Sequence, residues 1–155
     1  MNLFGLMDTS GSAMQAERAR AEVVAANMAN AETTRTESGG PYRRQHVVFA
    51  ANPADENFVS SFGAAAEKTL QPRSATEPPG GVHIAQVIED NAPALKRYDP
   101  EHPDAGPDGY VSYPDINPLT EMVDLMGATR AYGLNSSAVQ AEKGMISSAL
   151  DIARS

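Results

Sequence analysis

The sequence contains no cysteine and no tryptophan. Without cysteine, the chain can form neither a disulfide framework nor a thiolate metal site. It also lacks a run of the roughly eighteen apolar residues that a membrane-spanning helix needs. The first residues, MNLFGLMDTSG, contain no basic region, long apolar region or small-residue cleavage site. We therefore expect no membrane insertion and no ordinary cleaved secretory signal.

Basic residues are also scarce. The 12 Lys and Arg face 20 Asp and Glu, so the net charge is −8. Residues 1–36 carry three basic and four acidic side chains, residues 118–155 carry three and four, and residues 37–117 carry six and twelve. The sequence has no basic tract that could bind a phosphate backbone. We expect no nucleic-acid partner, and we expect the acidic excess to lie in the centre.

Proline is absent from both ends of the chain. All 11 prolines lie between Pro41 and Pro118. Because proline breaks helix interiors, only the ends can form long helices. We predict an N-terminal arm at 1–36, a non-helical centre at 37–117 and a C-terminal arm at 118–155. Asn117 is suited to cap the second helix, and Pro118 is suited to its first position.

Each arm has an apolar seam with heptad-like spacing. The N-terminal seam runs Leu3, Met7, Ser10, Met14, Glu17, Ala21, Val24, Met28, Ala31. The C-terminal seam runs Leu125, Ala128, Tyr132, Asn135, Val139, Glu142, Ile146, Ala149, Ala153. A second seam follows beside it, through Ala131, Leu134, Ala138, Ala141, Met145, Ser148, Ile152. Two adjacent seams make a face that needs more than one partner helix.

The seams have two interpretations: an ordinary bundle core, or a bundle completed by other subunits. Arms of this size would be roughly 42 and 52 Å long, and the loop-rich centre has little that could cover them. This imbalance favours packing between subunits. The candidate apolar interface residues are Met14, Val24, Met28, Leu125, Tyr132, Val139 and Ile146.

Three asparagines in the arms are unusual, because asparagine is a poor helix-interior residue. Asn27 and Asn30 stand one turn apart in VVAANMANAETT, and Asn135 lies in the C-terminal seam. Their amides could bond across a helix interface and set its register. Alternatively, the first pair could bond to the turn that ends the helix, or simply fray its end.

The centre favours short strands. Residues 42–49 (YRRQHVVF), 82–89 (VHIAQVIE) and 110–113 (YVSY) are β-prone and bounded by turn signals. Residues 50–81 have little periodicity, and FGAAAEK is the part of this stretch that favours a helical turn. The predicted class is α+β, with two long terminal helices packing together and a small β-rich, loop-rich central region.

The best candidate for chemistry is YDPEHPDAGPDG, residues 98–109. Its carboxylates and imidazole could bind a divalent ion, which leaves a metal-binding or metal-dependent enzyme module as an alternative. However, its spacing does not fit a calcium loop, since, counted from Asp99, the fifth position is Pro103 and the twelfth is Tyr110. No nucleotide-binding or hydrolase motif is present. We expect no enzyme activity and no cofactor.

Two terminal blocks resemble signatures of bacterial flagellar rod, hook and hook-associated proteins. They are SGSAMQAERARAEVVAANMANAETT at 10–34 and NPLTEMVDLMGATRAYGLNSSAVQ at 117–140. In the centre, GGPYRRQHVVF at 39–49 and APALKRYDPEHPDAGPDGYVSYPDINP at 92–118 are similar to the proximal rod members. Residues 52–79 depart from the family as an insertion or a flexible loop, and Gly133 stands where a helix-favouring residue is usual. Another rod or hook subunit is the alternative within the family.

The resemblance implies a structural subunit without catalytic activity. It implies export through the flagellar type III apparatus with an uncleaved signal, and assembly in the periplasm-spanning rod of the basal body. The partners would be other rod proteins and copies of the same chain, whose terminal helices pack together.

Overall fold

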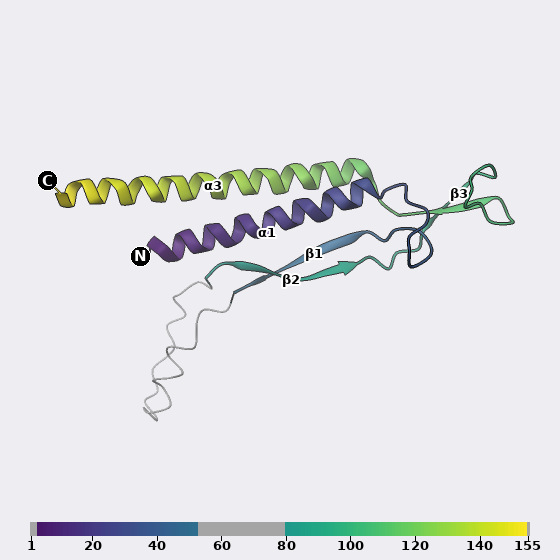
Figure 1. Cartoon of the computed structure of the whole chain (residues 1–155), viewed down its shortest axis with the longest axis horizontal. Coiled ribbons are helices and arrows are strands. Elements are labelled where there is room, and N and C mark those ends of the chain that lie inside the picture. Colours follow the sequence, from purple (N-terminus) through teal and green to yellow (C-terminus); the bar gives the residue numbers. More distant parts are fainter. Residues whose placement is uncertain (1–2, 53–79, 155) are drawn as a thin grey trace, which may run out of the picture.

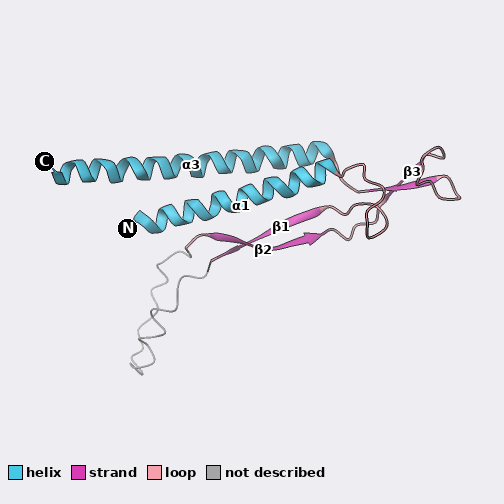
Figure 2. Cartoon of the chain, in the orientation of Figure 1, coloured by secondary structure: helices cyan, strands magenta, loops and turns pink. Residues whose placement is uncertain are grey.

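Two long antiparallel helices form the body of the molecule (Figure 1). In the computed structural model, which describes residues 3–52 and 80–154, they are α1 (Leu3–Ala29) and α3 (Pro118–Arg154). Short antiparallel strands lie between them in sequence (Figure 2). The predicted α+β class is therefore confirmed. The insertion expected at 52–79, with its helical turn at FGAAAEK, lies outside the described residues apart from Asn52.

The helix ends follow from capping residues. The side-chain oxygen of Asn117 accepts a hydrogen bond from the Leu119 amide at 3.0 Å, and Pro118 is the first helical residue. The predicted start of the second helix is thus confirmed. Helix α1 ends at Ala29, seven residues before the end of the N-terminal arm predicted at 1–36. The reason lies in Asn30, which is described with the candidate site below.

The strands form two separate hairpin-like pairs. Strand β1 (Gln45–Ala51) pairs with β2 (Val82–Glu89), and β3 (Leu95–Tyr98) pairs with β4 (Tyr110–Tyr113). The pairing of β1 with β2 shifts register between Val48 and Phe49, which marks a β-bulge. Two predicted strands match β2 and β4, whereas the predicted 42–49 strand begins later, at Gln45. Strand β3 was not predicted. Its four residues are all exposed, so apolar and polar side chains do not alternate along it.

Helix α1 lies in the middle of three layers, with α3 on one side and the β1–β2 pair on the other (Figure 1). Its contact with α3 uses small side chains: Ala16 and Ala128 are both buried. Its contact with β2 is also close. Gly81 has φ +98°, and a Cβ there would lie 2.4 Å from the Ser12 hydroxyl oxygen. That hydroxyl instead accepts a hydrogen bond from the Val82 amide at 3.0 Å.

The β3–β4 pair carries a small core of its own beyond the helix junction (Figure 1). Val111, Tyr113 and Ile116 are buried there. The Arg97 guanidinium lies 4.0 Å from the Tyr113 ring centre, in a cation–π arrangement. The core of the molecule is therefore thin and spread along its length, so specific polar contacts matter more for holding the layers in place.

Candidate assembly site

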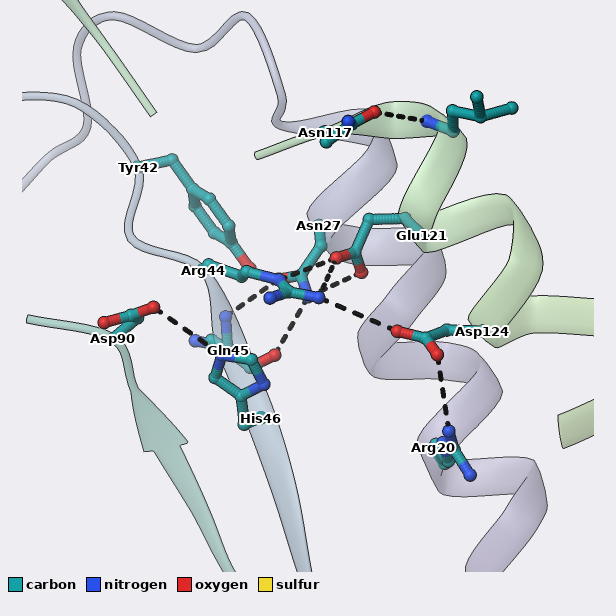
Figure 3. Close-up of polar contacts among 11 residues, drawn as sticks. Arg20, Asn27, Tyr42, Arg44, Gln45, His46, Asp90, Asn117, Glu121 and Asp124 are labelled. Atoms are coloured by element: carbon teal, nitrogen blue, oxygen red, sulfur yellow. Dashed lines mark hydrogen bonds and ion pairs between the residues drawn. The ribbon is translucent and has the colours of Figure 1, made fainter. Parts of the chain in front are cut away.

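Asn27 is the centre of a buried polar cluster where α1, α3 and β1 meet (Figure 3). Its side chain is 1% exposed. The amide nitrogen donates to Glu121 Oε2 at 3.1 Å and to the Gln45 carbonyl at 2.9 Å. The amide oxygen accepts from the Gln45 amide at 2.9 Å and from the Tyr42 hydroxyl at 3.2 Å. All four hydrogen-bonding positions of the side chain are therefore used.

Charged side chains extend this cluster along α3. Arg44 Nε donates to Glu121 Oε1 at 2.6 Å, and a guanidinium nitrogen of Arg44 contacts the same oxygen. Glu121 is 1% exposed, so its carboxylate depends on these partners. Asp124 lies 3.7 Å from Arg44 and 3.6 Å from Arg20 on α1 (Figure 3). The cluster thus joins the end of α1, the start of α3 and the start of β1.

Tyr42 contributes a neutral hydroxyl donor to the cluster. Burial raises the pKa of its phenol above the ordinary value of 10.0, and the carboxylates of Glu89 and Glu121 raise it further. The phenol consequently keeps its proton well into the alkaline range and continues to donate to Asn27.

Asn30 and Asn135 bond locally, Asn30 at the end of α1 and Asn135 within α3. The Asn30 amide nitrogen donates to the Ala26 carbonyl at 2.9 Å, and its side-chain oxygen accepts from the Thr33 hydroxyl at 3.1 Å. These bonds replace the next helical turn, which explains why α1 ends at Ala29. The Asn135 amide nitrogen donates to the Ala131 carbonyl at 2.9 Å. Of the three asparagines, Asn27 bonds across a helix interface and Asn30 bonds to the turn that ends the helix.

The apolar seam residues divide by exposure. Val24 is buried between the layers, and the others except Tyr132 are half-buried, namely Met14, Met28, Leu125, Val139 and Ile146. Tyr132 is 44% exposed. The two first seams thus face the interior of the chain to a large extent. Their use between subunits stays a prediction.

The second C-terminal seam is much more open. Its large members Leu134 and Met145 are 67% and 54% exposed. Further apolar side chains of α3 are also open to solvent, namely Leu119, Met122, Val123 and Met126. A run of exposed apolar groups along one helix marks an interaction surface. Neither described helix is long and apolar enough to cross a membrane.

Residues 98–109 form a turn-rich loop held by its own backbone. The Asp99 amide donates to the Gly109 carbonyl at 3.0 Å, and the Asp104 carboxylate accepts from the Thr34 hydroxyl at 2.7 Å. A guanidinium nitrogen of Arg35 lies 3.8 Å from the same carboxylate. The described residues contain no group of three His, Asp or Glu side chains placed to hold a metal ion. The loop thus contacts the segment that follows α1 through Thr34 and Arg35.

Sequence reasoning missed the charged half of the cluster. Glu121 had a detectable signal, since it lies four residues before Leu125 and extends the C-terminal seam back by one turn. A carboxylate buried in such a seam is destabilising unless it is paired with a cation. The identity of that cation, Arg44, could not be deduced, because it comes from a segment that was predicted as strand.

Comparisons with known proteins cover both helices. A family model described as flagella basal body rod protein matches residues 7–35, and one described as flagellar basal body rod FlgEFG protein C-terminal matches residues 108–152. The chain is 37% identical over 158 residues to the flagellar basal-body rod protein FlgC of Bacillus subtilis, with 99% of this chain and 100% of the relative covered.

Other relatives give the same result. The chain is 36% identical to FlgC of Borreliella burgdorferi, with 98% of each chain covered. It is also 36% identical to FlgC of Escherichia coli O6:H1, with 94% of each chain covered. Neither a metal-binding module nor a different axial subunit is favoured by these matches. The chain belongs to the FlgC family of flagellar basal-body rod proteins.

Proposed function

We propose that this chain is a structural subunit of the flagellar basal-body rod and assembles through its terminal helices. The observation that carries the proposal is the full-length similarity to FlgC, which includes both arms. The exposed apolar face of α3 supports it, because an isolated chain gains nothing by leaving that face in water. Its partners are other rod proteins and further copies of the chain.

The route to the rod follows from the same family membership. The chain leaves the cytoplasm through the flagellar type III export apparatus, without cleavage of a signal, and takes its place in the rod across the periplasm. It acts by packing and carries out no reaction. The absence of cysteine is consistent with this route, since no thiol is available for unwanted crosslinks during export.

The function is tested by removing the gene from its motile host and restoring it. We expect loss of swimming, recovery with the intact gene, and the chain in isolated basal bodies, where labelled cryo-EM would place it in the rod. Normal swimming without the gene, together with absence of the chain from basal bodies, would contradict the proposal.

The role of the helices is tested by Tyr132→Asp. Val24 is less suitable, because its burial means that a charge there would disturb packing within the chain. Tyr132 is 44% exposed, so we expect the aspartate variant to fold. In a subunit contact, however, the new carboxylate would be buried without a cation, which destabilises that contact. We expect swimming to fall strongly, whereas Gln15→Asp on the exposed face of α1 leaves it unchanged. Equal swimming of both variants would remove Tyr132 from the interface.

A further inference from the structure

A continuous exposed stripe runs along α3, on the side away from α1. It is built from positions three or four residues apart, which share one face of a helix. Its first half has large apolar side chains, and its second half has small residues. We call it the outer stripe; its principal members are Leu119, Val123, Met126, Gly133, Ala141 and Gly144, all exposed.

Glycine in the second half has no explanation within the described part of the chain. Gly133 and Gly144 lie inside the helix, where glycine is destabilising relative to alanine. A Cβ built at either position would meet no atom within 4 Å. The backbone is thus bared toward open space, which allows another helix to approach closely.

Two charges on the outer stripe lack partners. Arg130 and Asp151 are exposed, and neither forms an ion pair with any residue between 3 and 52 or between 80 and 154. Asp151 follows Arg130 by 21 residues, and Gly144 follows Val123 by the same 21. A single shift therefore matches a cation to an anion and a large side chain to a glycine. At 1.5 Å per residue the shift is about 31 Å.

We propose that the first half of the outer stripe in one copy packs on the second half in a parallel second copy, displaced by about 31 Å along the helix. This inference rests on the proposed rod function and specifies its contact surface. Val123 of one copy lies over Gly144 of the next, and Arg130 pairs with Asp151. The two copies use different halves of the stripe, so the contact is heterologous and does not close on itself. A growing rod requires such a contact.

The exposed face of α1 is a poorer partner, because charged side chains stand among its small residues. It presents Gln15, Arg18 and Glu22, and the last two already form an ion pair at 3.0 Å. Packing the apolar half of the outer stripe on this face would strip water from charges without replacing it. The second half of the outer stripe, small and nearly uncharged, is the surface that accepts it.

Disulfide crosslinking tests the register directly, since the chain has no cysteine of its own. The double variant Val123→Cys/Gly144→Cys is oxidised in isolated basal bodies. The two positions face each other between copies but lie far apart within one helix, so we expect a ladder of crosslinked multimers. Val123→Cys alone and Gln15→Cys/Gly144→Cys should remain monomeric. Double-variant chains that enter basal bodies but yield only monomers would overturn the proposal.

A second pair of variants tests the same register if the cysteine variants are not incorporated into basal bodies. Gly144→Ala and Gly11→Ala both fill open space in a helix. Each should raise the Tm of the isolated chain by roughly 2–4 °C. We expect only Gly144→Ala to lower incorporation into basal bodies, by several-fold, because its methyl group keeps the second helix away. Equal incorporation of both variants would overturn the register and leave the rod function intact. Absence of the wild-type chain from basal bodies would instead refute that function.

Discussion

Asn27 occupies a position where asparagine is intrinsically poor for a helix, and its surroundings explain why it is useful. The Asn27 side chain bonds to the backbone amide and the backbone carbonyl of Gln45, as a neighbouring strand would. Because it also holds Glu121 and Tyr42, one residue fixes the position of three segments that are distant in sequence. A larger apolar residue would pack there but would satisfy none of these groups.

The first prediction concerns this residue. Asn27→Ala leaves the Gln45 backbone and the Tyr42 hydroxyl without their partner, and should lower the free energy of unfolding by about 3 kcal/mol. Urea unfolding followed by circular dichroism would measure it. Asn135→Ala is the matched control, because Asn135 bonds only within its own helix, and it should change stability by less than about 0.5 kcal/mol. Equal effects of the two variants would contradict a special role for Asn27.

The second prediction concerns Tyr42 and pH. Because the folded chain raises the pKa of this phenol above 10.0, the unfolded chain loses the proton first as pH rises. The stabilising contribution is complete below pH 10.0 and is lost between that value and the folded pKa. We therefore expect the stability difference between wild type and Tyr42→Phe to be constant from about pH 7 to 9 and to shrink above pH 10.0.

Urea unfolding at several pH values would measure that difference. Tyr132→Phe serves as the control, since its ring is 44% exposed and forms no hydrogen bond within the described residues. A difference that stays constant up to pH 11 or grows in that range would show that the folded chain does not protect the Tyr42 phenol.

At the scale of secondary-structure elements, the Arg44–Glu121 pair ties β1 to the first turn of α3. Helix α3 begins at Pro118, and its capping by Asn117 fixes the direction in which Glu121 points. The buried carboxylate therefore reaches the segment that precedes β1. This link sets how the β1–β2 pair is placed against the two helices.

The third prediction separates breaking this pair from removing it. Arg44→Met leaves Glu121 buried without its cation and should cost about 3 kcal/mol of unfolding free energy. The double variant Arg44→Met/Glu121→Leu removes both charges, so we expect it to cost less, about 1 to 2 kcal/mol. Thermal and urea unfolding of the three chains would show the order. A double variant that is less stable than the single one would contradict this prediction, because it would mean that the buried Glu121 carboxylate still stabilises the chain without Arg44.

The sequence predicted these elements where a single strong signal governs them. The absence of proline and the Asn117–Pro118 pair located the helices, and the β-prone residues of VHIAQVIE between turn signals located β2. Strand β3 escaped because exposed residues carry no periodic pattern. The contacts of the polar cluster were not predicted for another reason. Asn27, Arg44 and Glu121 are far apart in sequence, and only the tertiary fold brings them together.

On the scale of the whole molecule, the stabilising contacts of the two helices are unevenly distributed along their length. One end has the buried cluster (Figure 3) and the β3–β4 pair, whereas the other has the two chain termini (Figure 1). Towards this open end, Glu142 is 3% exposed, and its Oε2 has no hydrogen-bond partner within the described residues. A buried carboxylate without a partner is destabilising. The fold therefore concentrates its stability at the junction and leaves the termini easier to open.

The fourth prediction follows from this inequality. In hydrogen exchange of the isolated chain, peptides covering residues 20–29 and 118–130 should exchange more slowly than those covering 3–12 and 140–154. Glu142→Met replaces the unpaired carboxylate with an apolar side chain, and should slow exchange at the open end and stabilise the chain by about 1 to 3 kcal/mol. Glu22→Met, at an exposed ion pair, should change neither the exchange rates nor the stability by a measurable amount.

Uniform protection along both helices would contradict this uneven distribution of stability, because it would mean that the termini open only when the whole chain unfolds. If the ends do open first, they are the part of the monomer free to rearrange when a second helix approaches.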